Sequence, residues 1–406
     1  MTQATAATGR RASRQALIAG IAAAALSIMV LTVGGLIGPR MGALLLTGGA
    51  LGVVLYHAAF GFTSAWRVFI LERRGRGLRA QMLLLAVAVV LFFPPLASGT
   101  LFGQEVSGFV APIGLSVVIG SFMFGVGMQL GGGCASGTLF TAGGGNARML
   151  VTLIFFILGS LLGTVHFDAW MALPAFAPVS LAEGLGAGGG IAASLALFAA
   201  IALVTVVLER RRHQSLEPAA APGDRRGGAR WLRGPWPLFF GAVALAVLNF
   251  VTLALAGRPW GITSAFALWG AKGFEALGGD PGQWAYWQQP GNAQALGTSI
   301  WQDVTSVMNI GIIVGAMLAA ALAGRFRPSL NIPARSLLAC VIGGILLGYG
   351  ARIAFGCNIG AYFSGIASGS LHGWVWMVFA FLGNMVGVKL RPWFFRNPAR
   401  PAVSGC

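Results

Sequence analysis

Charge is scarce in this sequence, and negative charge is scarcer still. Only 9% of the 406 residues are charged, with 10 Asp and Glu against 27 Lys and Arg, whereas 56% are hydrophobic. A soluble globule needs far more charge to cover its surface, so this composition excludes that class and predicts a chain embedded in a lipid bilayer. The net charge of +17 does not indicate a nucleic-acid partner, because the basic residues lie in short segments between long apolar runs.

Cysteine is also rare, and several chemical signatures are missing. Four cysteines occur, of which Cys134, Cys340 and Cys357 lie in apolar surroundings. We interpret them as thiols and not as a secreted disulfide framework. The sequence contains no Gly-x-x-x-x-Gly-Lys-[Ser/Thr] phosphate loop, which excludes a P-loop ATPase within the chain. We therefore expect channel-like or gradient-driven transport, with no cofactor and no metal site.

Long apolar runs are what the sequence has in quantity. About ten of them have the roughly 17 to 25 residues that cross a hydrocarbon core as a helix, which predicts an all-α polytopic membrane protein. A polar, basic N-terminal tail at 1–16 precedes the first run, which is too long for the core of a signal peptide. The predicted spans lie at about 17–37, 42–60, 80–97, 112–130, 149–167, 187–208, 236–256, 300–323, 336–353 and 373–389.

The basic residues predict the orientation of these spans. With the N terminus in the cytoplasm, the loops on that side carry nearly all the Lys and Arg, as the positive-inside rule requires. Both termini are then cytoplasmic, together with an Arg-, Pro- and Gly-rich linker at 209–235 and a tail at 391–406. The 27 basic residues lie on that side with the exception of Arg40, Arg258, Lys272 and Arg352.

Two short motifs occur twice, in the same order. The segment 131–137 (GGGCASG) is matched by 354–360 (AFGCNIG), and 61–66 (GFTSAW) is matched by 261–266 (GITSAF). Spans 2 to 5 then correspond to spans 7 to 10, and a shift by an odd number of spans turns the second unit upside down. Two inverted repeats of this kind are typical of secondary transporters.

The duplication also predicts how the chain is divided. The first membrane half, 17–208, contains an extra first span, a repeat unit at 42–167 and a connector span at 187–208. The second half, 236–390, is the inverted repeat unit. The Gly-rich segments between spans are too short to cross, so we predict four re-entrant half-helices. Non-helical backbone at membrane depth is stable only inside protein or beside a water-filled cavity. These segments therefore imply a path for a solute through the protein. They lie at 61–70, 131–148, 261–272 and 354–372.

The Gly-Cys segments would place thiols at helix starts. If half-helices begin shortly after Cys134 and Cys357, both thiols lie at positive helix ends, where free N–H groups favour an anion and a thiolate. The glycine before each cysteine leaves room for a small solute to reach backbone and sulfur together. The candidate substrate-binding residues of these segments are Cys134, Cys357, Gly133, Gly356, Ser136 and Asn358.

Other polar residues repeat along with the motifs. The Thr-Ser pairs of the second motif are predicted to cap the other two half-helices and to offer donors to the same anion. A charge inside a span costs at least about 2.5 kcal/mol and is normally functional, so we interpret Arg352 as attracting an anion, with snorkelling as the alternative. The further candidates are Thr63, Ser64, Thr263, Ser264, Gln129 and Arg352, with Cys340 as a possible third thiol.

The same pattern has a purely structural interpretation. Gly-rich membrane helices pack closely through small residues, and buried cysteine behaves as a small hydrophobe. A Ser or Thr hydroxyl often only forms a hydrogen bond with a backbone group. For Cys340, which has no repeat partner, packing is the favoured interpretation. For two Gly-Cys motifs related by duplication, a function is favoured.

The duplicated Gly-Cys-x-x-Gly, at 133–137 and 356–360, resembles the signature of the YeeE/YedE family of membrane proteins, described as sulfur transporters. The resemblance covers nearly the whole membrane region. It implies inner-membrane uptake of thiosulfate or a related sulfur anion in bacteria, with the ion passed between cysteine thiols. It also implies a small cytoplasmic TusA-like sulfur-carrier protein as a partner. Thiosulfate importers of this family have a further cysteine ahead of the second motif, for which Cys340 is the only candidate.

Three hypotheses follow for the function. The leading one is a permease and not an enzyme, with Cys134 serving the cytoplasmic half of the path and Cys357 the outer half. A second is a membrane sulfurtransferase that forms a cysteine persulfide, although a nucleophilic thiolate usually needs a nearby base and neither Gly-Cys segment contains one. A third is a transporter of selenium compounds or persulfide-like species, since soft substrates suit thiols equally well.

Overall fold

The computed structural model describes residues 2–218, 229–328 and 332–395. In this part of the chain ten helical stretches are long and apolar enough to cross a membrane, so the predicted all-α polytopic fold is confirmed. They contain the helices α1 (Thr2–Leu36), α2 (Pro39–His57), α4 (Arg76–Ser98), α5 (Leu115–Gly131), α7 (Ala147–Val165), α9 (Leu181–His213), α11 (Leu238–Ala256), α15 (Val304–Leu322), α16 (Ala334–Ile353) and α18 (Leu371–Phe394).

Short helices occupy the four segments that were predicted to be re-entrant. Two are α-helices at the second motif, α3 (Phe62–Glu72) and α12 (Thr263–Ala276). The Gly-Cys segments form α6 (Ala135–Gly143) and a π-helix, η2 (Asn358–Ser364), which continues as α17 (Gly365–Ala367). That these helices dip into a bilayer and return stays a prediction.

The connections at one end of the molecule carry structure that the apolar pattern did not indicate. Four two-residue strands form two antiparallel pairs, β1 (Thr100–Leu101) with β2 (Gln104–Glu105) and β3 (Ile113–Gly114) with β4 (Ala175–Phe176). The remaining short elements are α8 (Phe167–Met171), α10 (Ala229–Arg233), η1 (Pro281–Gln283), α13 (Ala285–Gln288) and α14 (Pro290–Gly297).

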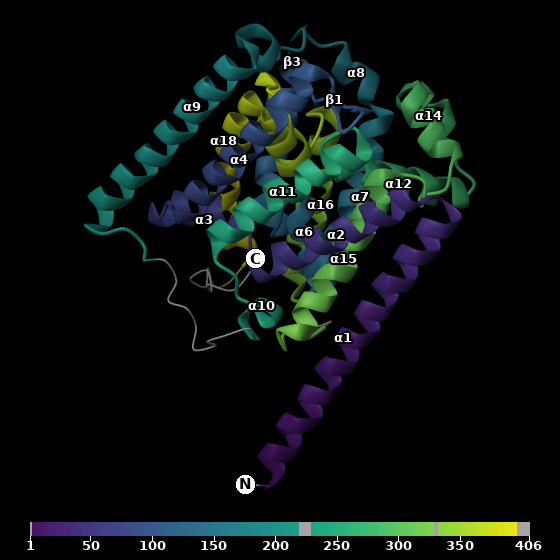
Figure 1. The fold of residues 1–406 in the computed structure, drawn as a ribbon, viewed down its shortest axis with the longest axis vertical. Coiled ribbons are helices and arrows are strands. Elements are labelled where there is room, and N and C mark those ends of the chain that lie inside the picture. Colours follow the sequence, from purple (N-terminus) through teal and green to yellow (C-terminus); the bar gives the residue numbers. More distant parts are fainter. Residues whose placement is uncertain (1, 219–228, 329–331, 396–406) are drawn as a thin grey trace.

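Two long helices flank the body of the protein. Figure 1 shows α1 and α9 along opposite outer edges, with the N-terminal part of α1 extending beyond the other helices. Only 17% of the apolar window of each is buried, which fits helices whose outer faces meet lipid. Because α1 begins at Thr2, the expected tail at 1–16 is helical over its described part, from residue 2 onward. The linker centre at 219–228 and the tail from 396 onward, including Cys406, lie outside the described residues.

Helix contacts in the core come in matched pairs. The Gly-x-Gly positions explain two of them, because a Cβ added at Gly125 of α5 would overlap a carbonyl oxygen of α18, and one at Gly348 of α16 would overlap a carbonyl oxygen of α7. The second glycines, Gly127 and Gly350, lie where α5 and α16 meet each other. Such close approaches are possible only without a side chain. Exchanging the two predicted repeat units maps each of these contacts onto the other, whereas the repeats themselves and their opposite orientation in a bilayer stay predictions.

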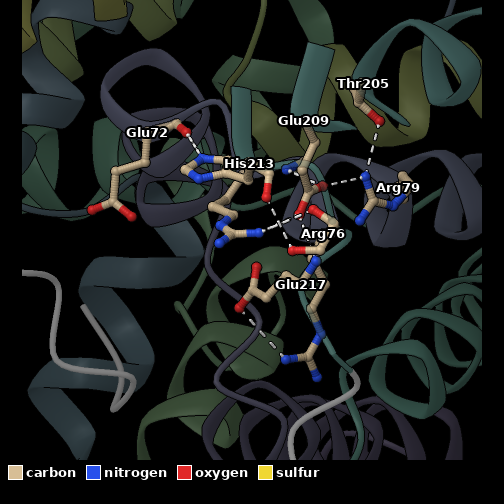
Figure 2. Close-up of polar contacts among 10 residues, drawn as sticks. Glu72, Arg76, Arg79, Thr205, Glu209, His213 and Glu217 are labelled. Atoms are coloured by element: carbon tan, nitrogen blue, oxygen red, sulfur yellow. Dashed lines mark hydrogen bonds and ion pairs between the residues drawn. The ribbon is translucent and has the colours of Figure 1, made fainter. Parts of the chain in front are cut away.

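A buried carboxylate fixes the end of the connector helix α9. Glu209 is fully buried and accepts from Arg79 Nη1 at 2.8 Å and from the Gly75 backbone N–H at 3.0 Å. Its other oxygen accepts from the Glu217 backbone N–H at 2.7 Å and lies 3.3 Å from Arg74 Nη1. Figure 2 shows Glu209 at the centre of these contacts. The cluster ties the loop between α3 and α4 to the start of the linker between the two halves.

Candidate functional site

Each of the two duplicated cysteines lies at the start of a short helix. Cys134 is the N-cap of α6 and is 1% exposed, and Cys357 is the N-cap of η2 and is fully buried. Both have extended backbone, as expected for the residue immediately before a helix, and both are present as thiols. The prediction that thiols stand at the two helix starts is therefore correct.

The two helix starts lie next to each other. Helices α6 and η2 are in contact, and the two thiols are close enough to interact electrostatically. The first N–H groups of a helix have no intrahelical partner and carry partial positive charge. Both helix starts carry this partial charge, although at η2 the Ile359 N–H is bonded to the Cys357 sulfur, and binding of an anion here stays a prediction.

Hydrogen bonds hold the two sulfur atoms in different ways. Cys134 Sγ lies 3.4 Å from Ser136 Oγ, whereas Cys357 Sγ accepts from the Ile359 backbone N–H at 3.4 Å. The second cysteine thus caps its own helix. The sulfur of Cys134 instead lies within hydrogen-bond distance of a side-chain hydroxyl, so Ser136 is beside the thiol, as the sequence indicated.

The glycines around the cysteines permit tight turns. A Cβ added at Gly133 would lie 3.2 Å from the backbone at Gly137, and one at Gly356 would lie 2.7 Å from the Ala361 nitrogen. Gly356 also has a φ of +152°, which L side chains rarely adopt. By contrast, a Cβ added at Gly360 would find no atom within 4 Å. There is therefore open space beside η2, three residues after Cys357.

Several polar side chains near the thiols are buried without a partner. Asn358 is fully buried, and in the described part of the chain neither its Oδ1 nor its Nδ2 has a hydrogen-bond partner. The hydroxyl of Tyr362, one turn further along η2, is likewise buried and unpaired. An unsatisfied buried polar group costs about 1–3 kcal/mol. Both side chains carry this cost in the described structure, and substrate binding by Asn358 stays a prediction.

Gln129 and Arg352 lie five residues before the two cysteines and both reach the second motif. Gln129 Nε2 donates to the Thr63 carbonyl at 3.3 Å, and Arg352 Nη2 donates to the Thr263 carbonyl at 3.1 Å. Arg352 also donates to the Tyr286 hydroxyl and lies 5.0 Å from that ring. These contacts anchor both side chains to protein, and attraction of an anion by Arg352 stays a prediction.

The predicted caps of α3 and α12 are wrong. Gly61 and Ile262 are the N-cap residues, and neither helix has a side-chain cap. The Thr and Ser residues already lie within the first turn, where a hydroxyl is past the N–H groups that a cap satisfies. Ser64 instead donates to the Gly61 carbonyl, and Ser264 to Thr305. The Thr63 hydroxyl is unpaired in the described structure.

Cys340 lies on a long helix and not at a helix start. It is fully buried on α16, beside Thr152 and Arg148 of α7. Thr152 in turn donates to the carbonyl of Gly131 at 3.1 Å, which places this thiol near the end of α5. Its role as a third thiol stays a prediction.

Two buried asparagines complete the surroundings and were not singled out from the sequence. Asn384 of α18 accepts from Gln129 Nε2 at 2.6 Å. Asn249 of α11 accepts from the Trp260 N–H and donates to Ser364. The sequence did contain a signal for both, because an isolated amide side chain inside an apolar span costs free energy and is usually hydrogen-bonded. No cluster of three or more His, Cys, Asp or Glu that could hold a metal occurs within the described ranges.

Comparison with known proteins finds relatives across most of the chain. TsuA of Spirochaeta thermophila, named a thiosulfate transporter, is 30% identical over 351 residues, covering 84% of this chain and 96% of that protein. TsuA of Escherichia coli K12 is 27% identical over 351 residues, covering 84% and 91%. The probable transporter YedE of the same organism is 28% identical over 172 residues, or 42% of each chain. The profile of the family described as "Sulphur transport" matches residues 57–386, so the chain belongs to this family, the YeeE/YedE family that the duplicated motif predicted.

Proposed function

We propose that this protein is a permease that imports thiosulfate or a related small sulfur anion across the bacterial inner membrane, with both termini in the cytoplasm. The observation that carries the proposal is the position of Cys134 and Cys357, which lie at the starts of two short helices that contact each other. The names of the TsuA relatives support the substrate class.

The chemistry of the paired helix starts suits this substrate. A divalent anion that leaves water needs several donors, because burying an uncompensated charge is very costly. Two helix starts, two thiol groups and the unpaired amide of Asn358 offer such donors, and a hydrogen bond to a charged group contributes about 1.5–3 kcal/mol. A polarisable sulfane sulfur also suits a thiol surface. Donors shared between two helices allow the ion to move from one to the other.

The two half-helices lead away from this point toward opposite ends of the protein. The segment after η2 reaches the connection between β2 and β3, where the Ser368 hydroxyl accepts from the Phe109 backbone N–H at 2.9 Å. The segment after α6 reaches the basic end, where Gly145 lies beside Phe326 and Arg327. This supports a path in which Cys357 serves the outer half and Cys134 the cytoplasmic half.

Uptake into membrane vesicles tests the proposal. Vesicles that contain the intact protein should accumulate radiolabelled thiosulfate, and Cys134→Ala and Cys357→Ala should each lower the initial rate at least tenfold. Cys340→Ala is the matched control, since it also removes a buried thiol, and its effect should be milder. Near-normal uptake by both single variants would refute the thiol path.

The same preparation separates transport from sulfur transfer. In a sulfurtransferase, a thiolate attacks the sulfane sulfur of thiosulfate, the S–S bond breaks, sulfite leaves and a cysteine persulfide remains. Mass spectrometry of Cys134 after exposure to thiosulfate would detect that product, and a stable persulfide would favour the enzyme. A permease leaves the thiol unmodified.

The substrate range and the partner are also open to direct measurement. Selenium compounds and persulfide-like species should be compared as competitors of labelled thiosulfate, because a better competitor would replace thiosulfate as the substrate. We further propose that a small TusA-like carrier protein receives the sulfur on the cytoplasmic side. Its addition inside vesicles should raise the extent of uptake.

A further inference from the structure

A cavity of about 530 Å³ opens at the basic end of the protein, apart from the paired thiols. We call it the basic cavity. It lies where α2 and α6 end and where α7 and α16 begin, and Phe140 and Thr141 of the last turns of α6 form part of its wall. The distribution of basic residues assigns this end to the cytoplasm. Its volume falls within the range of sites that bind small molecules.

Four arginines line the basic cavity, and they come from segments far apart in the sequence. Arg148 belongs to α7, Arg233 to α10, and Arg325 and Arg327 to the connection after α15. Among the described residues, no Asp or Glu lines the cavity. None of these four arginines belongs to an ion pair within the described residues, because the ion pairs there are formed by Arg74, Arg76 and Arg79. Four like charges around one space repel each other, and an anion in that space would relieve the repulsion.

Two helix starts add to the positive field. α7 begins at Ala147, which lines the cavity together with its cap Asn146. α16 begins after Pro333, a cap residue that offers no side-chain acceptor, and Pro333 and Ser336 also line the cavity. Both helices span about five turns, so both starts present N–H groups and a helix dipole to an anion.

The duplication supplies an independent sign that a ligand belongs here. Thr141 corresponds to Ser364 in the other half, where the Ser364 hydroxyl donates to the Trp260 carbonyl at 2.7 Å and accepts from Asn249 at 3.2 Å. Thr141 lines the basic cavity, and its hydroxyl oxygen is buried and has no partner in the described structure. Arginines on a cytoplasmic face follow from membrane topology alone, but a cavity with a buried, unpaired hydroxyl in its wall does not.

We propose that the basic cavity is a second anion-binding site, which holds a small divalent oxoanion. Guanidinium groups match the oxygen edges of a tetrahedral anion with two parallel hydrogen bonds, and the remaining volume accommodates its water. The anion is either the transported ion after it leaves the thiols or a resident cytosolic oxoanion such as sulfate or phosphate. Binding at this site does not depend on the proposed transport function.

Equilibrium binding of radiolabelled sulfate to the full-length protein in detergent, at fixed ionic strength, tests the proposal. The double variant Arg325→Gln/Arg327→Gln should weaken binding at least tenfold, and Thr141→Val should weaken it severalfold with no change of charge. Arg211→Gln is the control, because Arg211 is exposed on α9 and does not line the cavity. Thermal unfolding checks that each variant is folded.

The outcomes separate this site from the thiol pair. Cys134→Ala/Cys357→Ala should bind sulfate as the unmodified protein does, so a loss of transport in that variant leaves the second site standing. Phosphate and sulfate competing as well as thiosulfate would identify a general oxoanion site, and thiosulfate alone competing would identify a site for the released ion. Binding that persists in both cavity variants, that is lost only with the thiols, or that occurs with acidic peptides but with no inorganic oxoanion would overturn the proposal.

Discussion

Gln129 and Arg352, each five residues before a Gly-Cys cysteine, occupy matching positions in the two predicted repeat units and make the same backbone contact. Each donates to the carbonyl of the Thr in the second motif of its own half, Gln129 to Thr63 and Arg352 to Thr263. The two duplicated motifs are therefore joined to each other in both halves. One half uses a neutral amide for this bond and the other uses a cation, so the charge of Arg352 is not required for the bond itself.

Replacing Arg352 by the residue of the other repeat separates these two roles. Arg352→Ala should lower the free energy of unfolding by about 1–3 kcal/mol, because it leaves buried acceptors unpaired. Arg352→Gln should restore most of that stability while it removes the charge. If the charge attracts the anion, Arg352→Gln should raise the KM for thiosulfate uptake severalfold with little change in thermal stability. Arg40→Gln, an exposed arginine, is the control, and an unchanged KM in Arg352→Gln would assign Arg352 a purely structural role.

Two glycines of the second half should respond to alanine in opposite ways. Gly348→Ala places a methyl group against the carbonyl oxygen of Phe156, so α16 and α7 must separate, at a cost of about 1–3 kcal/mol. Gly360→Ala adds the same group to open space beside Cys357. We expect Gly348→Ala to lower the unfolding temperature and the yield, and Gly360→Ala to fold normally but to slow uptake severalfold. Equal stability of the two variants would contradict the close approach of α16 and α7.

Glu209 should be the carboxylate whose loss destabilises the protein most. In Glu209→Ala, Arg79 and the backbone N–H groups of Gly75 and Glu217 lose their acceptor. Removing one partner of a buried ion pair costs about 3–5 kcal/mol. Limited proteolysis should cut the linker faster in Glu209→Ala than in Glu183→Ala, which removes a carboxylate from the other end of α9. Equal cleavage rates would show that the cluster does not hold the linker.

Much of the fold follows from the sequence, because long apolar runs have few alternatives to membrane helices. The two thiols at helix starts were also predictable, since the Gly-Cys motif is repeated. The caps of α3 and α12 were misplaced by one to three residues, because Gly61 and Ile262 have no side chain that accepts a hydrogen bond and so give no capping signal in the sequence. The basic cavity could not be predicted, because its arginines come from separate segments that only the folded chain brings together.

Asn358 offers the sharpest test of the space beside Cys357. Its amide is buried with no partner in the described structure, so replacing it should cost little stability unless it binds a solute. Asn358→Asp keeps the shape of the side chain but puts a negative charge beside the thiols, which should repel a divalent anion and lower uptake at least tenfold. Asn358→Ala should lower uptake less, through the loss of one donor, and should unfold at nearly the same temperature as the unmodified protein. If Asn358→Asp and Asn358→Ala transport equally well, the anion does not pass this residue, and the path must run along another face of η2.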